Sequence, residues 1–279
     1  ELYIGLENAA PQQIVSLLIQ VLEGSENPEE ESFVGKQHVE WDVLCSDNWQ
    51  SLDSSAIISN NTGNLLKSGI LKFNLPKEAN TDNTLLPAGL IWLRARIHKN
   101  YNAVSKVIGI HAQAVLAKFK NNDNDLKHLN NSLPAESISK MVSRIPKVKG
   151  LTQPYNSFGG KPQESDEDYY RRISERLRHK NRAVSIWDYE HLVLQNFPEI
   201  HKAKCLSHTC TKVLDNKRQT KYLAPGSVVV VVIPDIVNKN VFDIYQPRVS
   251  KATLSKIQQF LKRHNSKLVQ TLVINPEYE

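Results

Sequence analysis

Hydrophobic and polar residues alternate in short runs along the first 120 residues of the chain. In the run HVEWDVLC, Val39, Trp41, Val43 and Cys45 fall on one side, and polar residues occupy most of the other. A period of two is typical of a β-strand with one buried face. Further runs of strand character lie at residues 2–7, 14–22, 68–76 and 89–98. Polar turn clusters separate these runs, which predicts an antiparallel β-sandwich or jelly roll.

The strand pattern weakens after this region. Residues 102–120 fit both a helix and a long strand, so this segment is left unassigned. Residues 121–160 are rich in Asn, Ser, Pro and Gly, a composition typical of a segment that crosses a protein surface. At most one helical turn is expected there, near residues 135–142. A connector between two domains is therefore predicted.

Helical spacing dominates the next stretch. Ser165 is placed to cap a first helix, in which Tyr169, Ile173 and Leu177 recur every four residues as an apolar stripe. Ser185, with an aspartate three positions later, predicts the capped start of a second helix. The remaining pattern predicts a strand at 200–208, a polar loop at 209–226, a buried strand at 227–235, a helix at 250–265 and a strand at 268–276.

The chain is therefore predicted to be an α+β protein. A β-sandwich-like domain at 1–120 and a connector at 121–160 precede a small helix–helix–β–β–α–β domain at 161–279. The 279 residues are 40% hydrophobic and 23% charged, enough to bury real cores. Three cysteines are too few for a disulfide framework and favour a reducing compartment.

Two further expectations concern the membrane and the chain ends. The apolar runs fall far short of the ~20 residues that span a bilayer, which predicts no membrane insertion. The first residue is not Met, and the last residues lie just past a predicted strand. A piece of a longer polypeptide is therefore expected.

Sequence motifs for catalysis are missing. The chain contains neither a glycine-rich phosphate loop nor a GxSxG nucleophile elbow. Carboxylates gather at the start of the first predicted helix, where the positive helix end explains them without any chemistry. These carboxylates are Glu164, Asp166, Glu167 and Asp168. The sequence therefore predicts no enzyme, no catalytic residue, no cofactor and no small-molecule substrate.

Two stretches contain residue types that bind metals. His201, Cys205, His208 and Cys210 lie close together, but a zinc site needs a second distant pair of ligands, and none follows. The stretch NNDNDL resembles a calcium loop in composition only, because it lacks the central Gly and the closing Glu. No metal site is predicted.

Positive charge is concentrated around the first predicted helix, on Arg171, Arg172, Arg176, Arg178, Lys180 and Arg182. Acidic residues interleave with these cations. The pairs Arg171–Glu175 and Arg172–Asp168 lie at helical pairing distance, so a salt-bridged surface explains the pattern at least as well as phosphate contacts. The aromatic–basic repeat of a single-strand binder is missing too, and no nucleic-acid partner is predicted.

Three tryptophans leave a carbohydrate-binding module open as the alternative function. Trp41, Trp49 and Trp92 could form a sugar-stacking platform on the predicted sandwich. Trp41 is in phase with apolar neighbours and is expected in the core, whereas Trp92 shares its face with Arg94 and Arg96. Burial of these rings would argue against the platform, and an aligned open face would favour it.

The order of elements in the second half of the chain is distinctive. Gly159-Gly160, the acidic stretch 164–168 and the block RRISERLRHKNRA come first, followed by DYE, FPEI, the valine strand and a closing INP. In this order and spacing, residues 155–279 resemble the baseplate J-like family. These are wedge proteins in the baseplates of contractile-tailed phages and of related bacterial contractile injection systems. The first 120 residues are more loosely similar to the β-rich insert of injection-system members.

The resemblance implies a structural component that acts by assembly and has no catalytic residues. The implied partners are other baseplate proteins and further copies of the chain. It also implies synthesis in the bacterial cytoplasm and incorporation into a phage tail or injection-system particle. The two helices would then be docking surfaces, with Arg171, Arg178, Trp187 and Tyr189 as interface residues, since Arg and aromatic side chains dominate interface energies.

Overall fold

The structure of the chain is a computed structural model that describes residues 1–27, 39–160, 162–214, 217–236 and 242–278. Its contacts divide the chain into two compact units. The first contains Glu1–Val115, Asn181–Asp235 and Asn240–Glu279, and the second contains Leu116–Lys180 and Ile236–Lys239. The domain boundaries at residues 120 and 160 stay a prediction.

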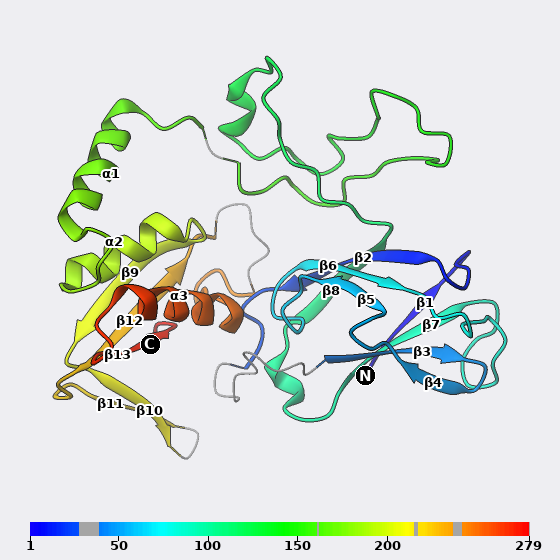
Figure 1. Ribbon diagram of the computed structural model, residues 1–279, viewed down its shortest axis with the longest axis horizontal. Helices are drawn as coiled ribbons and strands as arrows, with labels where there is room; N and C mark the ends of the chain where they lie inside the picture. The colour runs from blue at the N-terminus through cyan, green and yellow to red at the C-terminus, as the bar shows by residue number, and fades with distance from the viewer. Residues whose placement is uncertain (28–38, 161, 215–216, 237–241, 279) are drawn as a thin grey trace. The chain divides into compact units, whose positions relative to one another are not determined.

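Two four-stranded antiparallel sheets form the N-terminal part of the first unit (Figure 1). One sheet has the order β1 (Leu2–Leu6), β7 (Ile91–Ile97), β3 (Val39–Cys45), β4 (Asn48–Ser51). The other has the order β5 (Ile57–Asn60), β6 (Gly69–Asn74), β2 (Ile14–Leu22), β8 (Lys106–Ala112). A short 3-10 helix, η1 (Tyr101–Ala103), precedes β8. The predicted antiparallel sandwich is confirmed, and the unassigned segment proves to contain a strand.

The inward faces of the two sheets share one hydrophobic core. Trp41 and Val43 of β3 and Leu93 of β7 meet Leu17 of β2 and Phe73 of β6 there. Each is at most 1% exposed, and Trp41, Val43, Phe73 and Leu93 lie in the alternating phase that the sequence indicated. The alternation therefore identifies the face that points into this core, although Asp42 and Leu44 on the other face of β3 are buried as well. The short strand β5 was missed, because four residues with two apolar positions give too weak a pattern.

A second core lies in the C-terminal part of the first unit. Its sheet has the order β13 (Gln270–Ile274), β12 (Ser227–Pro234), β9 (Ile200–Ser207), with β12 parallel to β13 and antiparallel to β9. Helix α2 (Ile186–Asn196) packs on β9 and helix α3 (Lys251–His264) on β13. The helix–helix–β–β–α–β reading is thereby confirmed in its main elements.

The valine strand β12 is central but is less completely buried than predicted. Val230 and Val232 are 0% exposed and pack in the core with α2 and α3. Val229 is buried on the opposite face, whereas Val228 and Val231 are partly exposed. The face that packs on the helices is therefore buried at Val230 and Val232 but partly open at Val228, and the other face is partly open at Val231.

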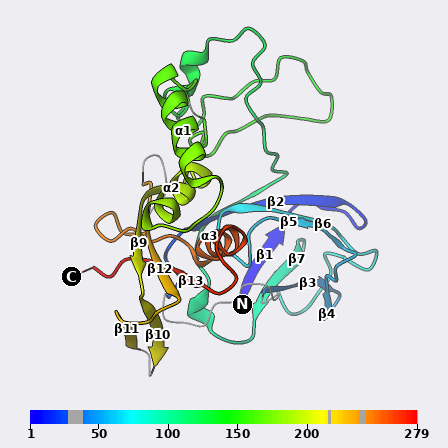
Figure 2. The same ribbon diagram turned by 60° about the vertical axis from the view of Figure 1, so that its left-hand side comes forward.

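The segment predicted as a polar loop instead forms a β-hairpin. Strands β10 (Cys210–Leu214) and β11 (Lys217–Lys221) pair in antiparallel register and extend away from the sheet (Figure 2). Thr211 lies opposite Thr220, and their hydroxyl oxygens are 3.2 Å apart. Threonine pairs across strands stabilise such ribbons. The loop prediction was wrong because the many lysines hid this strand character.

The second unit contains helix α1 (Asp166–His179) and a 3-10 helix, η2 (Leu126–Leu129). Most of its remaining described residues form turns and extended segments. The helical turn expected near residues 135–142 is not formed, and the only helix before α1 among the described residues of this unit is η2. Pro134 and the serines of that stretch favour turns over helix.

A buried carboxylate links the sandwich to the C-terminal core within the first unit. Glu26 is 5% exposed, and its Oε1 accepts a hydrogen bond from the backbone N–H of Lys251, the first residue of α3 (2.9 Å). Its Oε2 accepts from the hydroxyl of Ser105 (3.0 Å). A carboxylate at a helix N-terminus is favoured by the helix dipole as well as by these bonds. Glu26 therefore acts as an internal cap for α3.

Candidate protein interface

Helix α1 has well-defined ends. The Ser165 Oγ accepts a hydrogen bond from the Asp168 N–H (3.2 Å), which confirms the predicted N-cap. The chain leaves the helix at Lys180 in the left-handed conformation, with φ of 49°. Acidic residues fill the first turn, and Arg176 and Arg178 lie in the last turn, the arrangement that the helix dipole favours. The helix therefore presents its side chains from a regular backbone.

Ion pairs tie the arginines of α1 to carboxylates nearer the helix N-terminus. Arg171 pairs with Glu167 Oε1 (2.9 Å) and Asp168 Oδ1 (3.1 Å), and Arg172 donates two hydrogen bonds of 2.8 Å to Glu164. The hydrogen bonds from Arg172 lower the pKa of Glu164. The sequence spacing suggested pairs of Arg171 with Glu175 and of Arg172 with Asp168, whereas these contacts join Arg171 to Glu167 and Asp168, and Arg172 to Glu164. In a helix, an acidic residue placed N-terminal to its basic partner forms the more favourable pair. Arg172 also makes a bidentate contact with the Glu164 carboxylate.

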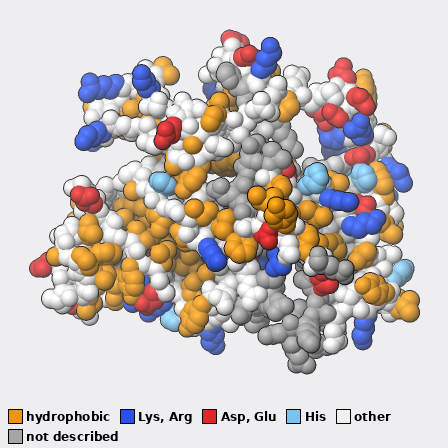
Figure 3. All heavy atoms as spheres, turned by 180° about the vertical axis from the view of Figure 1, so that it is seen from behind, with side chains coloured by type: hydrophobic (Ala, Val, Ile, Leu, Met, Phe, Trp, Pro, Cys, Tyr) orange, Lys and Arg blue, Asp and Glu red, His pale blue; other side chains and the backbone are white. Residues whose placement is uncertain are grey.

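The apolar stripe predicted on α1 is largely exposed. Tyr169 is 44% exposed and Leu177 is 68% exposed, with Ile173 half-buried between them. Tyr170 adds a further ring at 69% exposure, edge-on to Tyr169 with ring centroids 5.6 Å apart. Acidic and basic side chains gather over α1 (Figure 3), and the helix carries the ion pairs of Arg171 with Glu167 and Asp168. Tyrosine and arginine on an open, regular helix are the residue types that anchor protein interfaces.

The two interface candidates on α2 differ from each other. Trp187 is half-buried, and its ring stacks on His191 with centroids 3.8 Å apart. Tyr189 is 3% exposed and belongs to the C-terminal core, where burial raises the pKa of its hydroxyl. Its ring is thus inaccessible in this fold. Ser185 and Asp188 cap this helix reciprocally, as predicted.

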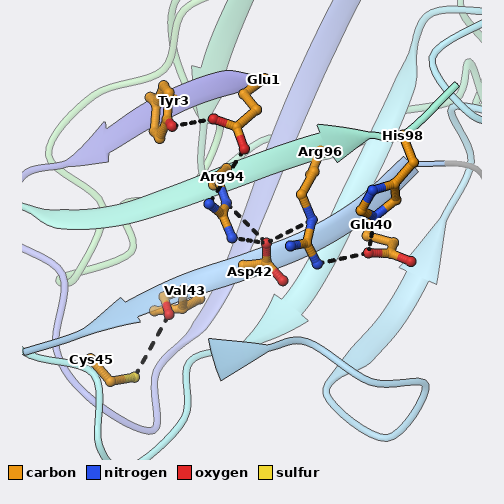
Figure 4. A network of polar contacts seen from close by, with 9 residues as sticks. All are labelled: Glu1, Tyr3, Glu40, Asp42, Val43, Cys45, Arg94, Arg96 and His98. Carbon is orange, nitrogen blue, oxygen red and sulfur yellow. Dashed lines mark hydrogen bonds and ion pairs between the residues drawn. The ribbon is translucent and has the colours of Figure 1, made fainter. Parts of the chain in front are cut away.

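A network of charged residues lies on the outer face of the first sandwich sheet (Figure 4). Arg94 of β7 donates from Nε (3.0 Å) and Nη2 (2.8 Å) to Oδ2 of Asp42 on β3, and Asp42 is 2% exposed. Arg96 donates to Glu40 Oε2 (2.8 Å), and His98 Nε2 lies 2.9 Å from the same oxygen. These contacts, that of His98 first, lower the pKa of Glu40.

The strand register explains how the network forms. Glu40 lies opposite Arg96 and Asp42 opposite Arg94, so each acid faces a base across β3 and β7. The alternation seen in the sequence contained this signal, because both acids and both arginines fall on the outward positions of their strands. Sequence reasoning assigned the faces correctly but did not pair the charges across them.

Aromatic rings border this network without forming the three-tryptophan platform. Trp41 is 1% exposed and points into the core. Trp49 has the Arg94 guanidinium 4.3 Å from its ring centroid and Tyr3 at 5.7 Å. The Trp92 indole N–H donates to the Pro87 carbonyl oxygen (2.9 Å). The buried Trp41 and the arginine over Trp49 leave no row of open rings among these three residues.

Metal-ligand residue types are dispersed in the part of the chain that the structure describes. There, no three His, Cys, Asp or Glu residues lie close enough together to hold a metal ion. Cys205 is buried, and burial raises the pKa of its thiol to about 12, so it stays protonated at neutral pH. A thiol in that state acts as a small apolar side chain rather than as a ligand. Over the same described residues, no helix is both long and apolar enough to cross a membrane.

A hollow of about 590 Å³ lies at the C-terminal end of α3 in the first unit. Arg182, His208, Arg263 and His264 line part of it, together with backbone and small polar side chains. The His264 Nδ1 lies 2.8 Å from the Phe260 carbonyl oxygen, so it is held within the helix's last turn. Basic residues at this end complement the negative helix terminus, which explains their presence without a ligand.

The model of the PVC11-like baseplate protein family matches residues 1–279, the full sequence. The chain belongs to this family. It is accordingly a structural baseplate component, which confirms the coarse assignment made from the sequence. No curated protein matches the sequence.

One solved structure with a similar chain is the cryo-EM structure of the anti-feeding prophage (AFP) baseplate, 6-fold symmetrised. The sequence identity is 17% and the TM-score is 0.40. The alignment covers 96% of this chain and 58% of that one, so this chain spans less than two thirds of the length of the baseplate chain it matches.

Proposed function

We propose that this chain is a wedge component of the baseplate of a contractile injection system and acts by protein–protein assembly rather than by catalysis. The family match over the whole chain carries this proposal. The proposed partners are other baseplate proteins and further copies of the chain. The proposed place of synthesis is the bacterial cytoplasm, followed by incorporation into the particle.

The finer assignment to a baseplate J-like architecture is part of the same proposal. The order of the two capped helices, the valine strand and the last helix and strand supports it. In the same way, the sandwich would correspond to the β-rich insert, and residues 121–160 to the connector between two domains.

Helix α1 is the proposed docking element. Arg171 and Arg178 are exposed, and the apolar stripe beside them offers area that a partner would bury. On α2, Trp187 is the residue proposed to contact a partner. Tyr189 takes no direct part in this proposal, because its side chain lies in the core.

The test is incorporation into particles. The gene for the protein that contains this chain is deleted in its host and then restored with an epitope tag. The tagged protein is expected to co-sediment with baseplates, and the deletion is expected to abolish assembled particles. Particles that assemble normally without the protein would refute the wedge role.

A further inference from the structure

A hydrogen-bonded stem closes a loop in the middle of the second unit. The Ser157 N–H donates to the Leu133 carbonyl oxygen (2.9 Å), and the Leu133 N–H donates to Ser157 Oγ (2.8 Å). Nearer the loop, the Glu136 N–H donates to the Gln153 carbonyl oxygen (2.8 Å), and the Ile138 N–H donates to Gln153 Oε1 (3.0 Å). A loop whose ends are joined in this way is an Ω-type loop, a structure that frequently carries function.

The loop between the two sides of the stem, residues 139–151, is called the basic loop. It carries Lys140, Arg144, Lys147 and Lys149, and the sequence contains no acidic residue from Ser137 to Gln163. All four cations are exposed, and none makes an ion pair with another described residue. The whole chain has a net charge of +6, so this short loop holds much of the excess.

Apolar side chains stand among these cations. Val142 is 108% exposed, Ile145 is 51% exposed and Val148 is 38% exposed. The loop curls around a hollow of about 500 Å³, lined by Met141 and Val148 among others. A hydrogen bond of 2.9 Å from the Val148 N–H to the Ile145 carbonyl oxygen keeps this curl closed. An exposed apolar centre rimmed by charge is the anatomy of an interface.

We propose that the basic loop binds an acidic surface on a different protein of the baseplate, with Val142 and Ile145 packing on an apolar spot within that surface. The inference rests on the proposed function. Charge complementarity selects the partner, since an unpaired basic surface is attracted to an acidic one and repelled by a basic one.

Two other occupants fit less well. A second copy of the chain is itself basic, which opposes contact through this loop. A nucleic acid would be expected to stack its bases on aromatic rings, and residues 139–151 contain none. An anionic lipid surface shares the charge of an acidic protein and is therefore included in the test.

The experiment measures binding of the full chain to each of the other baseplate proteins of the same particle, purified separately. Vesicles of phosphatidylcholine with phosphatidylserine form a parallel arm. The double variant Lys140→Glu/Arg144→Glu is compared with Lys118→Glu/Lys120→Glu, which makes the same charge change at exposed positions of the same unit. Wild type is expected to bind one acidic baseplate protein, and the first variant to lose roughly tenfold or more in affinity. The second variant is expected to bind nearly as wild type does.

The apolar part is tested with Val142→Ser/Ile145→Ser, which is expected to weaken the same binding without changing its salt dependence. Equal binding by the two charge variants would overturn the inference. So would binding of the wild type to vesicles alone, or to none of the proteins. Incorporation of the wild type into particles is scored separately, so failure of the basic loop and failure of the wedge role give different results. Circular dichroism and melting of each variant check that the fold is retained.

Discussion

Among the described residues, arginine–carboxylate pairs occur on the sandwich sheet and along helix α1, and the two sets differ mainly in burial. In the pair of Arg94 with Asp42, the side chains are 12% and 2% exposed. In the pair of Arg171 with Glu167, they are 59% and 84% exposed. The nitrogen–oxygen distances in the two pairs are alike, at 2.8 and 2.9 Å. The same chemistry therefore has two consequences: a buried pair is part of the fold, whereas an exposed pair leaves its members available to a partner.

The difference follows from where water can replace a lost partner. Removing Arg94 would leave the buried Asp42 carboxylate only the more distant Arg96 Nε, 3.7 Å away, whereas removing Arg171 would leave Glu167 hydrated. Docking residues should therefore come from the second kind of pair. The exposure of the paired side chains therefore distinguishes the charged residues of β3 and β7 from those of α1. Their spacing in the sequence distinguishes the two sets less clearly.

The largest effect is expected for Asp42→Asn. This change removes the buried carboxylate and leaves the Arg94 guanidinium only its longer contact with Glu1 (3.4 Å), which should lower the free energy of unfolding by about 3 kcal/mol. Urea unfolding followed by tryptophan fluorescence measures it. Glu40→Gln is the matched control on the same strand, because Glu40 is 41% exposed and should change stability far less. Equal losses for the two variants would break the contrast between buried and exposed pairs.

A second test concerns a buried group with no ionic partner. Burial raises the pKa of Cys205 to about 12, above its usual value near 9. Between these values the unfolded chain is deprotonated while the folded chain keeps its proton, so stability falls as pH rises from about 9 to about 12. A loss on the order of 2 kcal/mol by pH 11 is expected relative to the variant Cys205→Ala. If the free energies of unfolding of the wild type and of Cys205→Ala change in parallel with pH, this prediction is wrong.

The sequence predicted elements well wherever a single side of an element is apolar. The strands β3, β6 and β7 show a period of two, as Trp41 and Val43 do in β3, and α3 shows a helical period, as Ile257 and Leu261 do. The hairpin β10–β11 escaped because it carries many charged residues and no clear apolar face. Its register depends on pairs such as Thr211 with Thr220, which a single-sequence pattern does not display.

Burial of individual interface candidates was less predictable. Trp187 and Tyr189 lie two positions apart on α2, yet one is half-buried and the other is in the core. Their fates depend on how α2 meets α3 and β9, which are distant in the chain. The stem of the basic loop is hard to predict for the same reason, because Gln153 and Glu136 are distant in the sequence and meet only after folding. Partners so far apart in sequence leave no periodic signal.

A smaller loss is expected for Glu26→Gln, which places an uncharged group in a buried carboxylate site. The amide oxygen can still accept from the Lys251 N–H, but the attraction of the charge to the α3 N-terminus is lost. A decrease of about 1 kcal/mol in the free energy of unfolding is expected. Ser105→Ala, which removes the donor to the other oxygen, should cost a similar amount. If Glu26→Gln lowers the free energy of unfolding as much as Asp42→Asn does, a buried carboxylate can stabilise the fold strongly without a cation beside it.

The smallest effect on stability is expected for Arg171→Glu/Arg178→Glu. Both arginines are exposed, and water can solvate the acids that Arg171 leaves. The melting temperature should shift by less than about 2 °C, while incorporation of the protein into baseplates should fail if α1 docks on a partner. Lys118→Glu/Lys120→Glu gives the same charge change away from α1 and should assemble normally. Two results would break the contrast from which this prediction comes. If the α1 variant assembles as wild type does, the exposed pairs serve only the helix itself. If the variant unfolds instead, its ion pairs are structural like that of Asp42, and exposure is a poor guide to which charges a partner can use.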